Sequence, residues 1–169
     1  INEVVNGIAP LKRRPKMAII PTGTTNDYAR ALKVPRGNPV EAAKLIGKNQ
    51  TILMDIGLAK TKKDGKDVQS YFINIAAAGA ELLPQVKFRP VRVKHDKGVF
   101  EGKVSMIFVA LTNSIGGFEQ IVPDAKLDDG KFTLIMVKTG NLFEILHLLR
   151  LVLDGGKHIE HKHVEYLKT

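Results

Sequence analysis

The spacing of apolar residues changes near residue 51, and this change limits what the chain can fold into. Before it, residues 1–8 and 39–49 carry apolar residues at helical spacing, with a short apolar run at residues 17–20 between them. After it, apolar and polar residues alternate over many short runs, which is typical of strands. The pattern predicts an α/β portion over residues 1–50 and an all-β portion over residues 51–169.

The second portion carries strong turn signals between its predicted strands. Asp64-Gly65 separates strands expected at residues 52–59 and 68–77, and a turn at residues 96–98 lies between others within residues 86–113. A strand at residues 131–137 has apolar residues on both faces, which indicates a β-sandwich. One helix is expected at residues 141–154, and we expect it to pack on the sheet. Its predicted buried face contains Leu142, Ile145, Leu146, Leu149, Val152 and Leu153.

Residues 17–32 read as a strand, a tight turn and the start of a helix. Free N–H groups at such a helix start can bind an anion, and the hydroxyl groups of Thr24 and Thr25 could extend that site. An ordinary helix cap by Thr24, Thr25 or Asn26 explains the same residues. Asp27 would repel a phosphate unless a cation such as Mg²⁺ lay between them, so the stretch fits phosphate plus metal better than phosphate alone.

Three other stretches have competing interpretations. Residues 123–132 hold three carboxylates around an Asp-Gly turn, which is either a polar turn or a site for a hard cation. His158, His161 and His163 could suggest zinc, but their spacing and the lack of a nearby fourth ligand favour a solvated basic helix end. Residues 113–118 form a glycine-containing loop, and most such loops are turns.

Composition narrows the chemistry further. The 169 residues contain no cysteine, so thiolate metal sites and disulfides are excluded. A formal net charge of +9 makes anionic partners plausible. No apolar run approaches the roughly 20 residues that span a bilayer, and the glycine patterns of Walker A, Rossmann and protein-kinase sites are missing. No nucleophile elbow is present either, which disfavours acyl transfer.

The wording Pro-x-Gly-Thr-x-Asn-Asp-x-Ala-Arg-x-Leu at residues 21–32 resembles the diacylglycerol kinase catalytic domain of bacterial lipid kinases and their sphingosine kinase relatives. Residues 1–7 and 123–132 match that family too. The resemblance implies a nucleotide-binding α/β domain like that of phosphofructokinases and NAD kinases, followed by a β-sandwich. It also implies transfer of the ATP γ-phosphoryl group to diacylglycerol, giving phosphatidic acid.

The resemblance assigns roles to individual residues. Ile1, Asn2, Thr24 and Asn26 would contact the nucleotide, and Asp27 would reach its Mg²⁺ through water. Asp129 would bind a structural Mg²⁺ through its side chain, with the main-chain carbonyls of Lys126 and Lys131. Residues 113–118 would lie near the substrate. The family's Gly-Gly-Asp-Gly-Thr loop and the Asp-Gly-Glu that provides its proposed base are absent from the sequence.

These features also set expectations about the whole protein. The Met-less, uncapped opening, the aperiodic Ala80/Glu81 junction and the missing motifs lead us to expect a longer parent chain, with residues missing before Ile1, near that junction and after Thr169. We expect cytoplasmic location with peripheral association to an anionic inner membrane face, no nucleic-acid partner, and leave a homodimer open. NAD or sphingoid-base phosphorylation, or a non-catalytic module binding nucleotide or membrane, are the alternatives.

Overall fold

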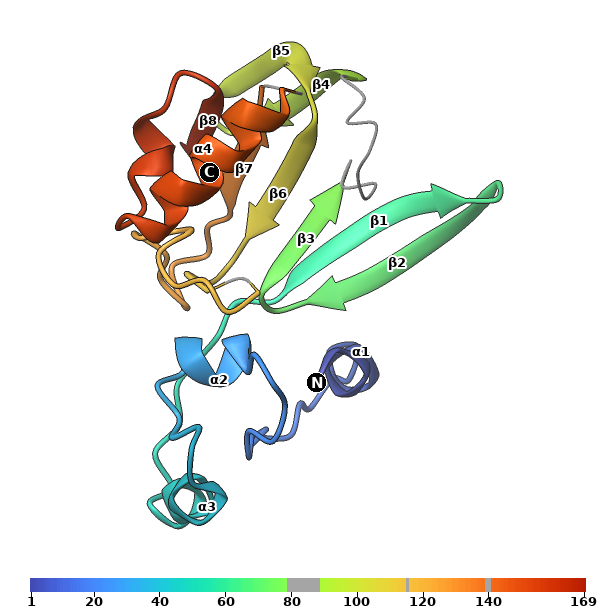
Figure 1. The fold of residues 1–169 in the computed structure, drawn as a ribbon. Helices are drawn as coiled ribbons and strands as arrows, with labels where there is room; N and C mark the ends of the chain where they lie inside the picture. The colour runs from blue at the N-terminus through green and yellow to red at the C-terminus, as the bar shows by residue number, and fades with distance from the viewer. Residues whose placement is uncertain (79–88, 115, 139–140) are drawn as a thin grey trace.

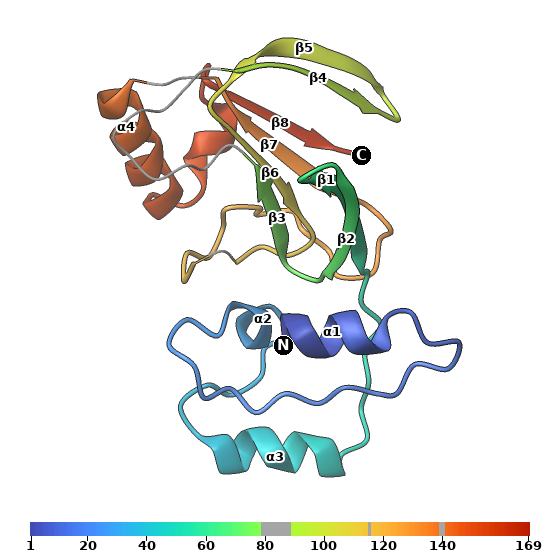
Figure 2. The same cartoon turned by 90° about the vertical axis from the view of Figure 1, so that its right-hand side faces the viewer.

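The computed structural model describes residues 1–78, 89–114, 116–138 and 141–169. Three short helices belong to the first portion of the chain and lie beneath a strand-rich second portion (Figures 1 and 2). The helices are α1 (Asn2–Ile8), α2 (Asp27–Ala31) and α3 (Pro39–Gly47). A strand-rich second portion was predicted and is present. The Ala80/Glu81 junction lies outside the described residues.

The apolar run at residues 17–20 was predicted to be a strand and is not one. No described strand pairs with it, and an extended segment becomes part of a sheet only when its N–H and C=O groups bond to a neighbour. Met17 and Ile19 nevertheless pack inward, while Ile20 is exposed. The run therefore has the alternation of a strand without its pairing.

The first predicted hairpin is confirmed. Strands β1 (Gly57–Lys63) and β2 (Lys66–Phe72) form an antiparallel ribbon in which Lys63 pairs with Lys66. Asp64 and Gly65, the two turn residues, have φ of 52° and 76°, as a two-residue turn that matches strand twist requires. The strand begins at Gly57, however, and residues 51–56, where a strand was expected to start, form none.

A four-stranded antiparallel sheet forms the centre of the second portion, in the order β3-β6-β7-β8. Its strands are β3 (Ile75–Ala78), β6 (Met106–Ala110), β7 (Thr133–Val137) and β8 (Val164–Lys168). Every residue of β7 is buried, as predicted for a strand with both faces covered. The single strand expected at residues 68–77 is divided, because the chain leaves the ribbon after Phe72 and enters this sheet at Ile75.

A second ribbon, a helix and a short 3₁₀ helix complete the strand-rich portion. A second ribbon joins β4 (Arg89–His95) to β5 (Gly98–Val104) across the predicted turn. Helix α4 (Leu142–Leu153) lies on one side of the four-stranded sheet and the β1–β2 ribbon on the other (Figures 1 and 2). A short 3₁₀ helix, η1 (Lys157–Glu160), leads into β8.

The predicted buried face of α4 is largely wrong. Leu148 is buried and Leu151 packs against the core cluster of the sheet, yet neither belongs to that face. A helix laid on a sheet buries a stripe of limited width, and the apolar arc of α4 is wider than that stripe. Ile145 and Val152 are half-buried, and the other apolar side chains face solvent: Leu142, Phe143, Leu146, Leu149 and Leu153.

Helix α3 shows the same difference on a smaller scale. Its start is fixed by Asn38, whose side chain accepts hydrogen bonds from the N–H groups of Val40 and Glu41 at 3.0 and 3.3 Å. Val40 and Ile46 are among the apolar residues that gave residues 39–49 their helical spacing, but both are exposed, and Ala42 is the buried residue.

A second core cluster joins the helical portion to the strands. Val5 of α1 and Tyr28 of α2 pack with Ile73, which lies between β2 and β3. Beside them, the Asn6 side chain donates to the carbonyl of Tyr71 at 2.8 Å and accepts from its N–H at 2.7 Å. The two portions are thus connected by apolar contacts and by a paired amide bridge.

Candidate functional site

The turn before α2 is closed by Asn26. Its backbone is left-handed, with φ of 51°, and its side chain bonds to both the N–H and the C=O of Gly23. Asparagine tolerates this conformation better than most residues. Although Asn26 occupies the N-cap position, its side chain makes no cap hydrogen bond, so the simple capping interpretation fails for Asn26.

Asp27, the first residue of α2, is bonded to the glycine loop of the strand-rich portion. One carboxylate oxygen, Oδ1, accepts from Ser114 Oγ at 2.9 Å and from the Gly117 N–H at 2.8 Å. The other, Oδ2, accepts from the Gly116 N–H at 2.8 Å. Gly116 and Gly117 have φ of 59° and 88°, which turns their N–H groups toward one anion.

This arrangement differs from the predicted phosphate site, which relied on the N–H groups and the dipole at the start of a helix. Helix α2 has only five residues, so its dipole adds little to anion binding. The loop N–H groups are directed at a protein carboxylate instead. A carboxylate has about four acceptor positions, and Asp27 uses three of them in these bonds. One position on Oδ2 is left over for a water molecule.

An ion pair between α2 and the residue after the glycine loop lies beside the contacts of Asp27. Arg30 of α2 pairs with Glu119, which follows the glycine loop, and its Nη2 lies 3.4 Å from the Thr25 carbonyl. A hollow of about 420 Å³ opens next to this pair. Its lining comes from α2, the loop and the end of α4: Arg30, Gly117, Phe118, Glu119, Gln120, Val152, Leu153 and Gly155.

The other predicted nucleotide residues lie on the surface. Ile1, Asn2 and Thr24 are exposed. Asn2 accepts a hydrogen bond from the Asn6 side chain through its main-chain carbonyl at 2.9 Å. Within the described residues no hydrogen bond joins Asn2 or Thr24 to Asp27, so their role at a nucleotide stays a prediction.

Asp129 lies in a separate turn with its own set of contacts. Its Oδ1 accepts from the Lys131 N–H at 3.1 Å, and its Oδ2 is 2.9 Å from Lys168 Nζ. Burial alone would raise the pKa of the Asp129 carboxyl, but the hydrogen bonds and charges of Lys168 and Lys131 lower it below its usual value. Asp55 supports the turn by accepting from the Gly130 N–H at 2.7 Å and donating its N–H to the Leu127 carbonyl at 2.7 Å.

The predicted metal ligands in this turn are the Asp129 carboxylate and main-chain carbonyls. All of them are oxygens, which is the ligand type that a hard cation prefers. Across the described ranges, no group of three or more histidine or acidic side chains is placed to hold a metal ion. A cation at Asp129 would therefore depend on main-chain carbonyls, such as those of Lys126 and Lys131, and on water. The oxygen ligands of the turn agree with the predicted Mg²⁺ site, and Mg²⁺ binding itself stays a prediction.

The three histidines considered for zinc do not share one location. His158 is buried and its Nε2 lies 3.1 Å from the Ile121 carbonyl. His161 and His163 instead lie near Glu144, each with Nε2 3.9 Å from Glu144 Oε2. Burial lowers the pKa of His161, while Glu144 acts in the opposite direction.

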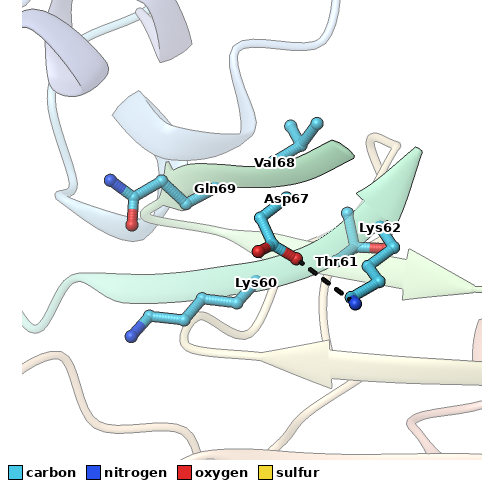
Figure 3. Close-up of a pocket in the computed structure, with 6 residues that line it drawn as sticks. All are labelled: Lys60, Thr61, Lys62, Asp67, Val68 and Gln69. Atoms are coloured by element: carbon cyan, nitrogen blue, oxygen red, sulfur yellow. Dashed lines mark ion pairs between the residues drawn. The ribbon is translucent and has the colours of Figure 1, made fainter. Parts of the chain in front are cut away.

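A second hollow, of about 800 Å³, lies on the β1–β2 ribbon and is open to solvent (Figure 3). Lys60, Thr61, Lys62, Asp67, Val68 and Gln69 line it. Lys62 and Asp67 form an ion pair across the strands at 4.0 Å, with both side chains mostly exposed. None of the predicted nucleotide or metal residues belongs to it, so we place the candidate site at Asp27 and its loop.

Sequence reasoning missed most of the partners of the predicted residues. Asn113–Phe118 was expected near substrate, but its pairing with Asp27 could not be deduced from a separation of about 90 positions. Asp55 and Lys168 carried no motif at all. The sequence held one indication of the pairing with Asp27, the consecutive glycines at residues 116–117. Successive glycine N–H groups often point toward a single anion.

Two family models together cover nearly the whole chain. A model described as the diacylglycerol kinase catalytic domain matches residues 1–59. A second, described as the YegS C-terminal NAD kinase beta sandwich-like domain, matches residues 61–169.

Individual relatives agree with these models. A diacylglycerol kinase from Staphylococcus haemolyticus is 40% identical over 195 aligned positions, which include the whole chain and 56% of that protein. One from Staphylococcus aureus is 39% identical and is covered to 59%. The chain therefore spans a little over half the length of these curated relatives.

Solved structures resemble the fold closely. A crystal structure from Bacillus anthracis, of a protein assigned as a diacylglycerol kinase, matches 99% of this chain and 60% of its own with a TM-score of 0.81 and 27% identity. A second diacylglycerol kinase structure from the same organism gives a TM-score of 0.73, also at 27% identity and 99% coverage of this chain, with 58% of its own covered.

Proposed function

This chain belongs to the bacterial diacylglycerol kinase family, and on that premise we propose that it is the part of a lipid kinase where nucleotide and lipid meet. The reaction is attack of a diacylglycerol hydroxyl oxygen on the γ-phosphorus of ATP. The bond to the β–γ bridging oxygen breaks, ADP leaves, and the hydroxyl proton passes to a base. The products are phosphatidic acid and ADP.

The contact between Asp27 and the glycine loop carries this proposal. Phosphoryl transfer depends mainly on positioning and on neutralising charge, rather than on covalent chemistry by the protein. Asp27 is held from three directions by Ser114, Gly116 and Gly117, so its charge is fixed in place before substrates arrive. It also stands where the helical and strand-rich portions touch, beside the hollow that Arg30 and Leu153 line.

We assign the remaining roles as the family resemblance implies. Ile1, Asn2, Thr24 and Asn26 would contact the nucleotide, and Asp27 would reach the nucleotide's Mg²⁺ through a water molecule. Mg²⁺, when bound, supplies neutralisation of phosphate charge. Asp129, with the carbonyls of Lys126 and Lys131, would hold a second, structural Mg²⁺, which would stabilise its turn.

A membrane surface is the proposed source of the lipid. The net charge of +9 favours an anionic bilayer. The exposed face of α4, with Phe143 81% and Leu153 68% accessible, offers apolar side chains to insert into it. None of the described helices is long and apolar enough to cross a membrane, so the contact we propose is peripheral.

The test is an assay of the full-length protein with ATP radiolabelled at the γ-phosphate and three acceptors: diacylglycerol, sphingosine and NAD. Diacylglycerol in mixed micelles should yield labelled phosphatidic acid, with sphingosine and NAD as competing acceptors. NAD deserves inclusion because the second matching family is described by its likeness to NAD kinase. Phosphorylation of NAD or sphingosine in preference to diacylglycerol would replace the proposed substrate, and labelling of none of them would refute kinase activity.

A further inference from the structure

The ammonium group of Lys168 lies among the oxygens of the Asp129 turn. Its Nζ is 2.9 Å from Asp129 Oδ2, donates to the Asp124 carbonyl at 2.8 Å, and lies 3.8 Å from Asp124 Oδ2. The Lys168 and Asp129 side chains are only 22% and 18% exposed. A protein cation is therefore already in contact with the carboxylate that the proposed function gives to structural Mg²⁺.

The ammonium group and a Mg²⁺ ion bound to this turn would share one atom, Asp129 Oδ2. Mg²⁺ binds oxygens at 2.0–2.1 Å in near-octahedral geometry and accepts little distortion. An ion bonded to Asp129 Oδ2 would lie close to Lys168 Nζ as that group is now placed, and like charges at such separation repel by roughly 1 kcal/mol or more even in water. In the present geometry, the ammonium group and a Mg²⁺ ion cannot both contact Asp129 Oδ2.

We propose that Lys168 is an internal competitor for the cation at the Asp129 turn, and that Mg²⁺ binds there only when the Lys168 side chain moves away. This inference rests on the proposed metal role of Asp129. In the metal-free protein, Lys168 neutralises the turn and connects it to β8. It thereby weakens Mg²⁺ binding, so the turn keeps its shape at low Mg²⁺ and responds only at higher concentration.

The surrounding contacts allow this exchange without rearrangement of the fold. The main chain of Lys168 pairs with Thr133 in the sheet, so only its flexible side chain needs to move. Tyr166, two residues earlier on β8, bonds to the Asp124 carboxylate, and Asp55 holds Gly130 and Leu127. These contacts keep the turn in position when the ammonium group leaves.

The experiment measures how MgCl₂ stabilises the full-length protein and its Lys168→Met variant. Melting temperatures are recorded against MgCl₂ at constant pH and constant ionic strength. The melting temperature should begin to rise at about tenfold lower Mg²⁺ in Lys168→Met, because stabilisation follows RT ln(1 + c/Kd), where c is the free Mg²⁺ concentration. Lys138→Met is the matched control, because Lys138 is similarly exposed and pairs with Glu165 on the same sheet at 2.9 Å. It should titrate like the parent.

A second variant and a second measurement keep the proposal testable if Lys168→Met does not fold. Lys168→Gln removes the charge but keeps a hydrogen-bond donor for the Asp124 carbonyl. Mn²⁺ replaces Mg²⁺ in the second measurement, and its binding is monitored by the loss of the free-ion electron paramagnetic resonance signal. The Lys168→Gln variant should bind Mn²⁺ more tightly than the parent by a similar factor.

The outcomes separate the two levels of the proposal. Equal Mg²⁺ dependence in parent and Lys168 variants, abolished by Asp129→Asn, would overturn the competition and leave the metal turn standing. No response to Mg²⁺ or Mn²⁺ in any protein would overturn both the metal turn and the role of Lys168. A shift to lower Mg²⁺ that depends on Asp129 supports both.

Discussion

At the scale of single residues, we propose that Asp27 has two roles, one in holding the glycine loop and one in the electrostatics of the reaction. Asp27→Asn keeps the shape but replaces one acceptor oxygen with a donor that faces N–H groups or the Ser114 hydroxyl. We expect kinase activity of the full-length protein to fall by a factor on the order of 100 or more. Loss of bonds to the loop should also cost about 1–3 kcal/mol of stability. Steady-state turnover and urea unfolding measure the two effects.

Ser114→Ala provides the control for Asp27. It removes one of the three bonds to the carboxylate and leaves the charge in place. If activity depends on the charge, Ser114→Ala should lose far less activity than Asp27→Asn at a comparable loss of stability. Parallel losses in the two variants would assign Asp27 to the structure alone.

His158 makes stability depend on pH. Burial lowers the pKa of His158, although the hydrogen bond to the Ile121 carbonyl raises it in part. The unfolded chain, with an ordinary histidine pKa of about 6.5, therefore binds protons more readily than the folded one. Stability should fall as the pH decreases below about 6.5 toward the folded-state pKa. Denaturant unfolding at pH 8 and pH 5 checks this.

The His158→Gln variant isolates that effect. Glutamine does not titrate and can donate to the same carbonyl, so the variant should lose less stability than the parent between pH 8 and pH 5. Parallel stability curves for the two proteins would show that other groups cause the pH dependence.

At the scale of elements, Asn6 connects α1 to β2. Its side chain bonds to both polar groups of the Tyr71 main chain, and that region is half-buried. Asn6→Ala leaves these groups unpaired and should cost about 1–3 kcal/mol of the free energy of unfolding. Asn2→Ala, which removes an exposed side chain from the same helix, should stay within about 0.5 kcal/mol of the parent. Equal effects of the two changes would argue against the bridge.

The sequence was most informative where local chemistry decides the structure. The Asp64-Gly65 turn and the Asn141 start of α4 were predictable because turn and cap preferences involve only neighbouring residues. The side of α4 that packs was not, since its apolar arc surrounds more than half the helix and only the sheet selects Leu148. The run at residues 17–20 has strand chemistry, but pairing depends on a partner strand.

The candidate site shows the same division. The motif at residues 21–32 marked Asp27, and the Asp-Gly turn marked Asp129, because both have recognisable wording. Their partners Ser114 and Lys168 lie 87 and 39 positions away, with no periodic pattern to connect them. Such pairs are set by the topology of the sheet, which residue preferences do not specify.

At the scale of the whole molecule, charge and exposed apolar surface predict peripheral membrane binding. Vesicles rich in anionic lipid should retain the protein, and added salt should release it, because each Lys or Arg near such a surface contributes about 1 kcal/mol. Phe143→Ser with Leu146→Ser should weaken retention several-fold by removing apolar insertion. Co-sedimentation measures both effects.

Val40→Ser is the control for membrane binding, because Val40 is 61% exposed, close to the 54% of Leu146, but lies on α3. It should bind like the parent. Retention that ignores both lipid charge and salt would exclude the electrostatic contribution, and equal effects of the α3 and α4 changes would exclude α4 as the contact.

The bonds between Asp27 and the glycine loop have a consequence for protein engineering. A chimera that takes its first 50 residues from one kinase and its sandwich from another inherits the carboxylate and its three donors from different parents. Unless the acceptor sequence carries a hydroxyl residue at position 114 and glycines at positions 116 and 117, the grafted aspartate lacks its support. Successful domain exchange in this family should therefore require that the loop be transplanted together with the motif.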